Sequence, residues 1–175
     1  MTCNCGQKRQ EEKTMQEKVL KLLCENARLS IDDLALRCNT APETIAAVIK
    51  DLENSGVICG YTVICNDQAL PERNQVKALI EVKVTPRRDG GFDRIAQKIA
   101  KFPEVTDLYL LSGGYDLLLT VQGDSLQQVA NFVAEKLATI DGVISTSTGF
   151  MLRKYKESGR IMQSEEEYER LKICL

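Results

Sequence analysis

The sequence predicts an α+β protein of two modules, an N-terminal winged helix-turn-helix and a C-terminal ferredoxin-like βαββαβ domain. Three observations support this prediction. Apolar residues recur at helical spacing up to about residue 56, they alternate strictly from Val76 onward, and a polar stretch without a period, residues 66–75, separates the two patterns. The length of 175 residues suits two small modules.

The first module is expected to span residues 16–65. It follows residues 1–15, which show no hydrophobic periodicity and are expected to form a disordered tail. A first helix is expected from Met15, and Ser30 is the expected N-cap of a second helix. Asp33, three residues later, completes a capping box. The apolar residues expected to face inward on these two helices are Val19, Leu22, Leu23, Leu34, Ala35 and Cys38.

The third helix is expected to begin within Thr40-Ala41-Pro42-Glu43, where the capping pattern recurs and proline occupies the first turn, and to end at Ser55-Gly56. Its apolar residues follow i, i+3, i+4, i+7 spacing and are Ile45, Val48, Ile49 and Leu52. The short turn between the last two helices is typical of a helix-turn-helix, although a generic three-helix domain has the same pattern. The β-branched run at residues 57–64 favours the winged form, because a wing follows the third helix directly.

The second module is expected to span residues 76–156, after a linker formed by residues 66–75. Its first strand, residues 76–84, alternates between apolar and charged side chains. A helix from Phe92, two strands (105–111 and 115–122), a second helix (126–137) and a last strand (143–153) complete the order β-α-β-β-α-β. This order predicts a four-stranded antiparallel sheet with both helices on one face.

The other face of the sheet is expected to remain apolar and to pack against a partner subunit. The residues that predict this are Leu79, Leu118, Phe150 and Leu152. Residues 157–175 are expected to form a C-terminal helical tail, because Ser164 and Glu167 match a capping box.

Composition narrows the function. The chain has 23 basic and 25 acidic residues, a net charge of −2, and no histidine. The missing histidine argues against hydrolytic triads and most zinc catalysis, so we expect a binding or regulatory protein with no catalytic residues, metal or cofactor. The seven cysteines form no regular framework, and the Cys3-Asn4-Cys5 pair is a weak metal signal. With no apolar targeting or membrane segment in the sequence, reduced thiols in the cytoplasm are expected.

Two motifs at the expected separation resemble the Lrp/AsnC, or feast/famine, transcriptional regulators. They are Gly56-Val57-Ile58-Cys59-Gly60-Tyr61 and Ser112-Gly113-Gly114-Tyr115-Asp116, and Thr146-Ser147-Thr148 is similar to the family's T-x-T. The resemblance covers about residues 15–156. It implies a regulation-of-amino-acid-metabolism (RAM) domain that dimerises through its sheet, assembles into octamers and binds a small effector, usually an amino acid. The effector residues it implies are Gly113, Gly114, Tyr115, Asp116, Thr146 and Thr148.

The chemistry of these residues is compatible with an amino-acid effector. Glycines let backbone amides approach a carboxylate, and Asp116 can pair with an α-ammonium group. A structural interpretation stays open as well. Gly113-Gly114 also suits a tight hairpin, Tyr115 an interface, and Asp116 the capping of a backbone turn.

The third helix is expected to face the major groove of double-stranded DNA. The residues expected on this surface are Thr40, Glu43, Thr44, Ala47 and Lys50. The helix carries one cation, Lys50, against three carboxylates, and residues 16–60 hold five basic and seven acidic residues. Either DNA binding is weak per copy and recovered by multivalency, or the domain is a scaffold for protein contacts.

An effector-responsive, DNA-binding transcriptional regulator is the leading hypothesis. An oligomeric small-molecule sensor acting on a protein partner is the alternative, supported by the acidic third helix. Siroheme decarboxylases share this two-domain plan and make an enzyme a third hypothesis. The absence of histidine argues against it, because those enzymes resemble this chain but rely on histidine in their site.

Overall fold

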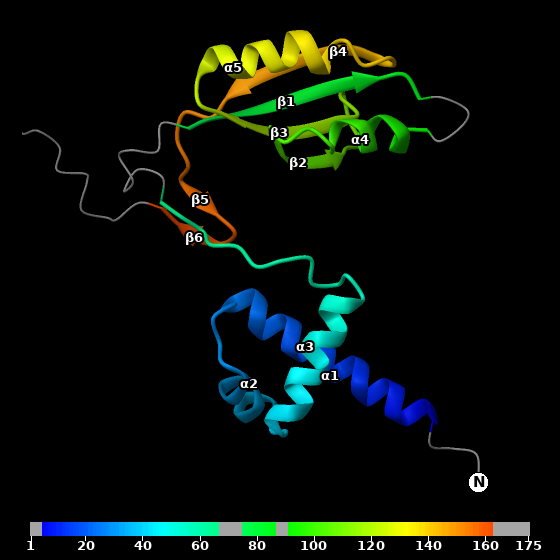
Figure 1. The fold of residues 1–175 in the computed structure, drawn as a ribbon, viewed down its shortest axis with the longest axis vertical. Coiled ribbons are helices and arrows are strands. Elements are labelled where there is room, and N and C mark those ends of the chain that lie inside the picture. Colours follow the sequence, from blue (N-terminus) through cyan, green and yellow to red (C-terminus); the bar gives the residue numbers. More distant parts are fainter. Residues whose placement is uncertain (1–4, 67–74, 87–90, 163–175) are drawn as a thin grey trace, which may run out of the picture. The chain divides into compact units, whose positions relative to one another are not determined.

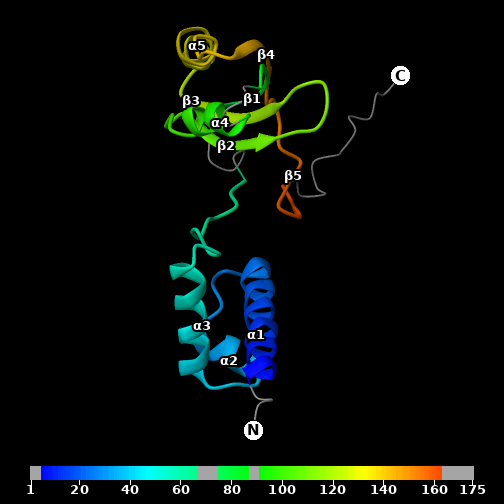
Figure 2. The same cartoon turned by 90° about the vertical axis from the view of Figure 1, so that its right-hand side faces the viewer.

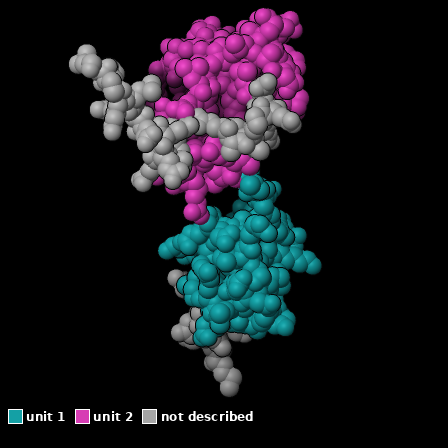
Figure 3. All heavy atoms as spheres, turned by 90° about the vertical axis from the view of Figure 1, so that its left-hand side faces the viewer, with its two compact units in different colours: residues 1–63 teal, residues 64–175 magenta. Residues whose placement is uncertain are grey.

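The computed structural model describes residues 5–66, 75–86 and 91–162. The chain divides into two units, residues 1–63 and 64–175, which Figure 3 shows in different colours. Each unit has its own hydrophobic core, and each is described by itself below.

The first unit is a three-helix domain made of α1 (Cys5–Glu25), α2 (Ile31–Cys38) and α3 (Pro42–Asn54) (Figures 1 and 2). Each helix contributes one side chain with no exposed surface to the centre of the core: Val19, Leu34 and Ile45. Val48, Ile49 and Ile58 pack around this centre. The predicted inward stripes of α2 and α3 are therefore confirmed.

Helix α1 is longer than the sequence pattern predicts. It begins at Cys5, so the prediction of a disordered tail is wrong for residues 5–15, while residues 1–4 lie outside the described part. The segment Gln7–Lys13 consists of glutamine, lysine, arginine and glutamate, which are good helix formers even where no face is buried. Hydrophobic periodicity reports burial, and a helix of this composition extends beyond its buried portion.

The capping box of α2 is confirmed. The Asp33 N–H donates to Ser30 Oγ at 3.1 Å, and the Ser30 N–H donates to Asp33 Oδ2 at 3.4 Å. The hydrogen bond from the Ser30 hydroxyl, followed by that from the Ser30 backbone, lowers the pKa of Asp33. By contrast, the predicted side-chain cap on α3 is wrong. Its N-cap is Ala41, which makes no side-chain hydrogen bond, and Pro42 supplies the first turn instead.

The predicted end of α3 at Ser55-Gly56 is confirmed, with Ser55 as the C-cap and Gly56 at φ +72°. Residues 57–66, however, form neither helix nor strand. The N–H groups of Val57 and Ile58 both donate to the Leu52 carbonyl at 3.0 Å, which closes the end of the helix. β-branched composition favours a strand only where a second strand offers hydrogen-bond partners, and the described residues of this unit pair no strand with this segment.

The second unit has the predicted βαββαβ order. Its elements are β1 (Val76–Val84), α4 (Asp93–Ile99), β2 (Val105–Leu110), β3 (Leu117–Gly123), α5 (Leu126–Asn131), which continues as a π-helical turn (Phe132–Leu137), and β4 (Val143–Phe150). The sheet is antiparallel with strand order β2-β3-β1-β4 (Figure 1). This is the ferredoxin-like plan.

The alternation predicted for β1 sets the core of this unit. Ala78, Ile80, Val82 and Val84 are buried, and Ile80 lies opposite Leu119 of β3 in the register. Side chains of the two helical segments cover this face, namely Ile95, Ile99, Val129, Phe132 and Leu137. The rings of Phe102 and Phe132 meet edge to face, with their centroids 5.5 Å apart.

The opposite face of the sheet is apolar only in part. Leu79 lies there, as does Leu118, which is directly opposite Tyr109 of β2. Phe150 was predicted on this face, but its partner across β4 is Ala78, so it lies on the helix-covered face. The same prediction is wrong for Leu152, which follows the end of β4. A one-residue shift moves a side chain to the other face, and the bulge between Lys83 and Val84 is what changes the register here.

A small hairpin follows the sheet. Strands β5 (Lys156–Glu157) and β6 (Arg160–Ile161) pair antiparallel around Ser158 and Gly159, whose φ angles of +45° and +81° suit a type I′ turn. The prediction of a helical tail is therefore wrong for residues 157–161. The capping pattern of Ser164 and Glu167 lies outside the described residues.

Candidate functional site

The exposed face of α3 carries the residues predicted to meet DNA. Glu43, Ala47 and Lys50 are exposed, and at 100° per residue they fall within about 60° of one another, opposite buried Ile45 and Leu52. Thr44 is exposed at the side of this face, and Thr40 is half-buried in the turn before the helix. The structure thus places four of the five predicted residues on one accessible helical surface.

The charge on this surface differs from a simple count over the helix. Glu53 accepts a hydrogen bond from the Tyr61 hydroxyl at 3.0 Å, which ties its carboxylate to the segment after α3. Partial desolvation and this hydrogen bond raise the pKa of Tyr61. Lys50 is therefore flanked on the exposed face by Glu43 and Asp51, while Glu53 has a structural contact.

Asp116 stands at the junction of three segments. Its Oδ2 accepts the N–H of Val84 at 2.8 Å, and its own N–H donates to the Val82 carbonyl at 3.0 Å. Its carbonyl accepts the N–H of Leu111 at 2.8 Å, which closes the loop of residues 111–116. The structural role left open for Asp116 is thus observed, and its carboxylate is held at the C-terminal end of β1.

Gly113 and Gly114 are exposed within this loop, and neither has a positive φ angle. A Cβ atom added at either position would meet no atom within 4 Å. Gly142 is the opposite case, because its φ is +100° and an added Cβ would lie 2.7 Å from Ile95 Cδ1. Within this chain, neither backbone strain nor crowding requires glycine at 113 or 114, which speaks against a tight hairpin as the reason for them.

The predicted threonines lie on β4, on the other side of β1. Thr146 is the register partner of Val82, so Asp116 and Thr146 flank the same end of β1 at about 10 Å, two strand spacings. Thr148 is opposite Ile80, about 7 Å further along the sheet. The structure therefore brings Asp116 and Thr146 to one end of the sheet, with half-buried Tyr115 beside Asp116.

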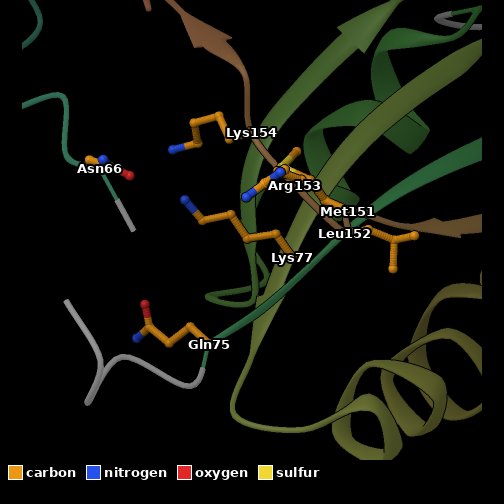
Figure 4. Close-up of a pocket in the computed structure, with 7 residues that line it drawn as sticks. All are labelled: Asn66, Gln75, Lys77, Met151, Leu152, Arg153 and Lys154. Atoms are coloured by element: carbon orange, nitrogen blue, oxygen red, sulfur yellow. The ribbon is translucent and has the colours of Figure 1, made fainter. Parts of the chain in front are cut away.

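A second hollow lies at the other end of β1, and sequence reasoning missed it. Its volume is about 180 Å³, and its lining residues are Asn66, Gln75, Lys77, Met151, Leu152, Arg153 and Lys154 (Figure 4). The three contributing segments are far apart in the sequence. Only the pairing of β1 with β4 brings the last two together, so no local motif marks the site.

Two further properties concern the described residues alone. Within them, we find no group of three or more His, Cys, Asp or Glu side chains arranged to hold a metal ion. Cys38 is buried in the first core, and Cys24 and Cys59 are exposed thiols, whereas Cys3 and Cys174 lie outside the described ranges. None of the helices in residues 5–66, 75–86 and 91–162 has the length and apolar character needed to cross a bilayer.

Comparison with known proteins identifies both modules. A winged helix-turn-helix DNA-binding model matches residues 14–58, and the Lrp/AsnC ligand-binding domain matches residues 77–161. The Bacillus subtilis HTH-type transcriptional regulator YugG is 37% identical over 155 residues, which are 89% of this chain and 93% of that protein.

Solved structures agree with these matches. The transcriptional regulator NMB0573 of Neisseria meningitidis, crystallised with L-methionine, has a TM-score of 0.63 and 26% identity, over 82% of this chain and 91% of that chain. AsnC of E. coli shares the fold, with a TM-score of 0.61 and 24% identity, over 82% of this chain and 94% of that chain. The chain belongs to the Lrp/AsnC family of transcriptional regulators.

Proposed function

We propose that this regulator binds double-stranded DNA through the exposed face of α3 and responds to an amino acid bound at the Gly113–Asp116 loop. The observation that carries the effector site is the pair of open glycines, which the chain itself does not need for its fold. The L-methionine complex of the Neisseria relative supports an amino acid as the class of effector.

Each part of an amino acid has a suitable partner in this proposal. The α-carboxylate approaches the amides of Gly113 and Gly114, where no side chain obstructs it. The α-ammonium pairs with Asp116, since a carboxylate accepts several hydrogen bonds and the Val84 N–H uses one of them. Thr146, at the same end of β1, adds a neutral hydroxyl, with Thr148 further along.

DNA binding is proposed to centre on Lys50, with Thr44 and Ala47 beside it and Thr40 and Glu43 at the start of the helix. One cation neutralises few phosphates, so the affinity per copy is expected to be modest. Linked copies in an oligomer raise the overall affinity by about 10²–10⁴. The exposed outer face of the sheet, with Leu79, Tyr109 and Leu118, is the proposed contact between subunits of a dimer that assembles into an octamer.

One observation favours a second candidate function. Glu43 and Asp51 flank Lys50 on the exposed face of α3, which is unusual for a surface that approaches phosphates. The second candidate is an oligomeric amino-acid sensor whose helix-turn-helix contacts a protein. It shares the effector site with the first candidate and differs in its prediction for DNA.

The effector site is tested by isothermal titration calorimetry of the purified chain against the twenty amino acids. At least one amino acid is expected to bind, and Gly114→Val is expected to weaken it at least about tenfold because the added side chain fills the approach. Gly60→Val is the matched control, since Gly60 is equally open but lies in the other unit. Binding that Gly114→Val leaves unchanged, or no binding by any amino acid, would contradict the proposed site.

A further inference from the structure

The hollow at the N-terminal end of β1 is strongly cationic. Its charged lining residues are Lys77, Arg153 and Lys154, and no acidic residue lines it. We call this hollow, with the seven lining residues given above, the cationic pocket. Figure 4 shows the nitrogen-bearing ends of the three cations directed to the same space, with Asn66 across from them.

The walls of the cationic pocket are held by backbone contacts. The Met151 N–H donates to the Lys77 carbonyl at 2.8 Å, which fixes the strand exit beside β1. Asn66 Nδ2 donates to the Met162 carbonyl at 2.9 Å, and Met162 is itself buried and bonded to Tyr155. Three separate segments are therefore fastened around one space.

The cations are also placed individually. Lys154 Nζ lies 2.6 Å from Glu157 Oε2, and only 14% of its side chain is exposed. The Arg153 guanidinium lies 5.7 Å from the centre of the Tyr155 ring, an arrangement that orients its planar donor face. Even after the charge of Glu157 is counted, three cations near one space leave a net charge of +2.

Such a charge calls for an anion with more than one negative charge. A phosphate monoester carries about −1.5 to −2 at neutral pH and has three acceptor oxygens, whereas a carboxylate carries −1. Arginine binds phosphate through a two-pronged contact, and lysine binds it as a point charge. The Gln75 carbonyl oxygen accepts from Gln122, so its amide nitrogen is the end that can donate to a ligand.

We propose that the cationic pocket binds a phosphate group. The pocket is separate from the proposed effector site, because Lys77 and Val84 stand seven residues apart on β1, about 23 Å along the strand. The proposal therefore stands or fails independently of the amino-acid effector. The phosphate belongs either to a free phosphorylated small molecule or to the backbone of bound DNA, and these two sources give different results in one set of experiments.

The first arm measures inorganic phosphate binding to the full chain by calorimetry, in chloride buffer at constant ionic strength. The double variant Lys77→Gln/Arg153→Gln is expected to weaken binding about tenfold or more, because two charged hydrogen-bond donors are lost. Lys83→Gln is the matched control, since Lys83 lies on the same strand and sheet face but outside the pocket. Circular dichroism melting of each variant checks that the fold is intact.

The second arm measures the salt dependence of duplex DNA binding by the same three proteins. Phosphate binding that the double variant loses and Lys83→Gln keeps supports the proposal, with a small molecule as the source. A salt slope that falls by about one per removed cation, without phosphate binding, supports it with DNA as the source. Phosphate binding that is equal in all three proteins, or neither effect in a folded double variant, overturns it.

Discussion

The backbone N–H of Val84 donates to Oδ2 of Asp116 at 2.8 Å, which joins the last residue of β1 to the loop before β3. One carboxylate therefore fixes the glycine loop and stands among the residues proposed to bind the effector. Thr146 flanks the same end of β1 from the other side. This contact places a structural bond and a proposed ligand contact on the same side chain, so the two must be separated experimentally.

Asp116→Ala and Asp116→Asn separate these roles. Alanine removes the acceptor of the Val84 N–H and is expected to lower the free energy of unfolding by about 1–2 kcal/mol. Asparagine keeps an oxygen acceptor and is expected to cost less, yet it removes the charge that pairs with an α-ammonium. Urea denaturation paired with amino-acid calorimetry checks this. Equal stability loss in both variants would show that the charge, and not the acceptor, holds the loop.

Two glycines are expected to respond in opposite ways to alanine. Gly142→Ala is expected to cost about 1–3 kcal/mol, because its φ is +100° and the new Cβ would lie 2.7 Å from Ile95 Cδ1. Gly113→Ala has open space and an ordinary φ, so stability is expected to stay the same or rise by up to about 1 kcal/mol. Thermal melting distinguishes the two, and a large loss at Gly113 would show that the loop needs glycine for its own fold.

Removal of the α2 capping box is expected to destabilise the first unit. Ser30→Ala deletes the acceptor of the Asp33 N–H, and such caps contribute about 1 kcal/mol. Ser55→Ala is a useful comparison, because that hydroxyl bonds only to the Leu52 carbonyl at the end of α3. Helix content and denaturant midpoints measure the effect, which should be larger for Ser30 than for Ser55.

The same cap predicts a dependence on acid. The pKa of Asp33 is lower in the folded chain than in the unfolded chain, chiefly because the Ser30 hydroxyl and amide bond to its carboxylate. A lowered carboxyl pKa stabilises the fold above the unfolded value of about 3.9, and this contribution is lost as the pH falls through the folded pKa. NMR titration of Asp33 in the wild type and in Ser30→Ala tests this. The variant should titrate closer to the ordinary value, and an unchanged titration would refute the cause.

The outer face of the sheet is expected to join subunits. Leu79→Lys places a charge on this face beside Leu118 and Tyr109 and is expected to weaken self-association at least tenfold. Leu126→Lys is the control, since Leu126 is also exposed but lies on α5. Light scattering over a range of concentrations measures the mass, and association that both variants retain would rule out this face as the contact.

Much of the fold follows from local patterns. Alternation in β1 correctly assigned its buried face, and the Ser30–Asp33 spacing correctly located the start of α2, because both signals depend on neighbours in the sequence. The face of Phe150 was wrong, since it depends on the register with Ala78 and on a bulge in the pairing of β1 and β4. The early start of α1 was missed because helix propensity acts there without burial.

The sites divide in the same way. The exposed face of α3 was predictable because helical spacing alone determines it. The open surroundings of Gly113 and the Val84–Asp116 contact were not, because they require the three-dimensional position of β1. The cationic pocket has no sequence signature, since Lys77 and Arg153 become neighbours only through strand pairing.

The central claim, that α3 binds a specific DNA site and that an amino acid modulates this binding, is tested most directly by salt-titrated equilibrium binding. The duplex comes from the upstream region of the protein's own gene, and a scrambled duplex of equal composition serves for comparison, each with and without the amino acid found by calorimetry. The account predicts a preference of about 10³ or more for the upstream duplex and a shift with the amino acid. Lys50→Gln should reduce the salt slope by about one, while Lys21→Gln on α1 should leave the preference intact. Equal affinity for the two duplexes, unaffected by Lys50→Gln, would contradict the account.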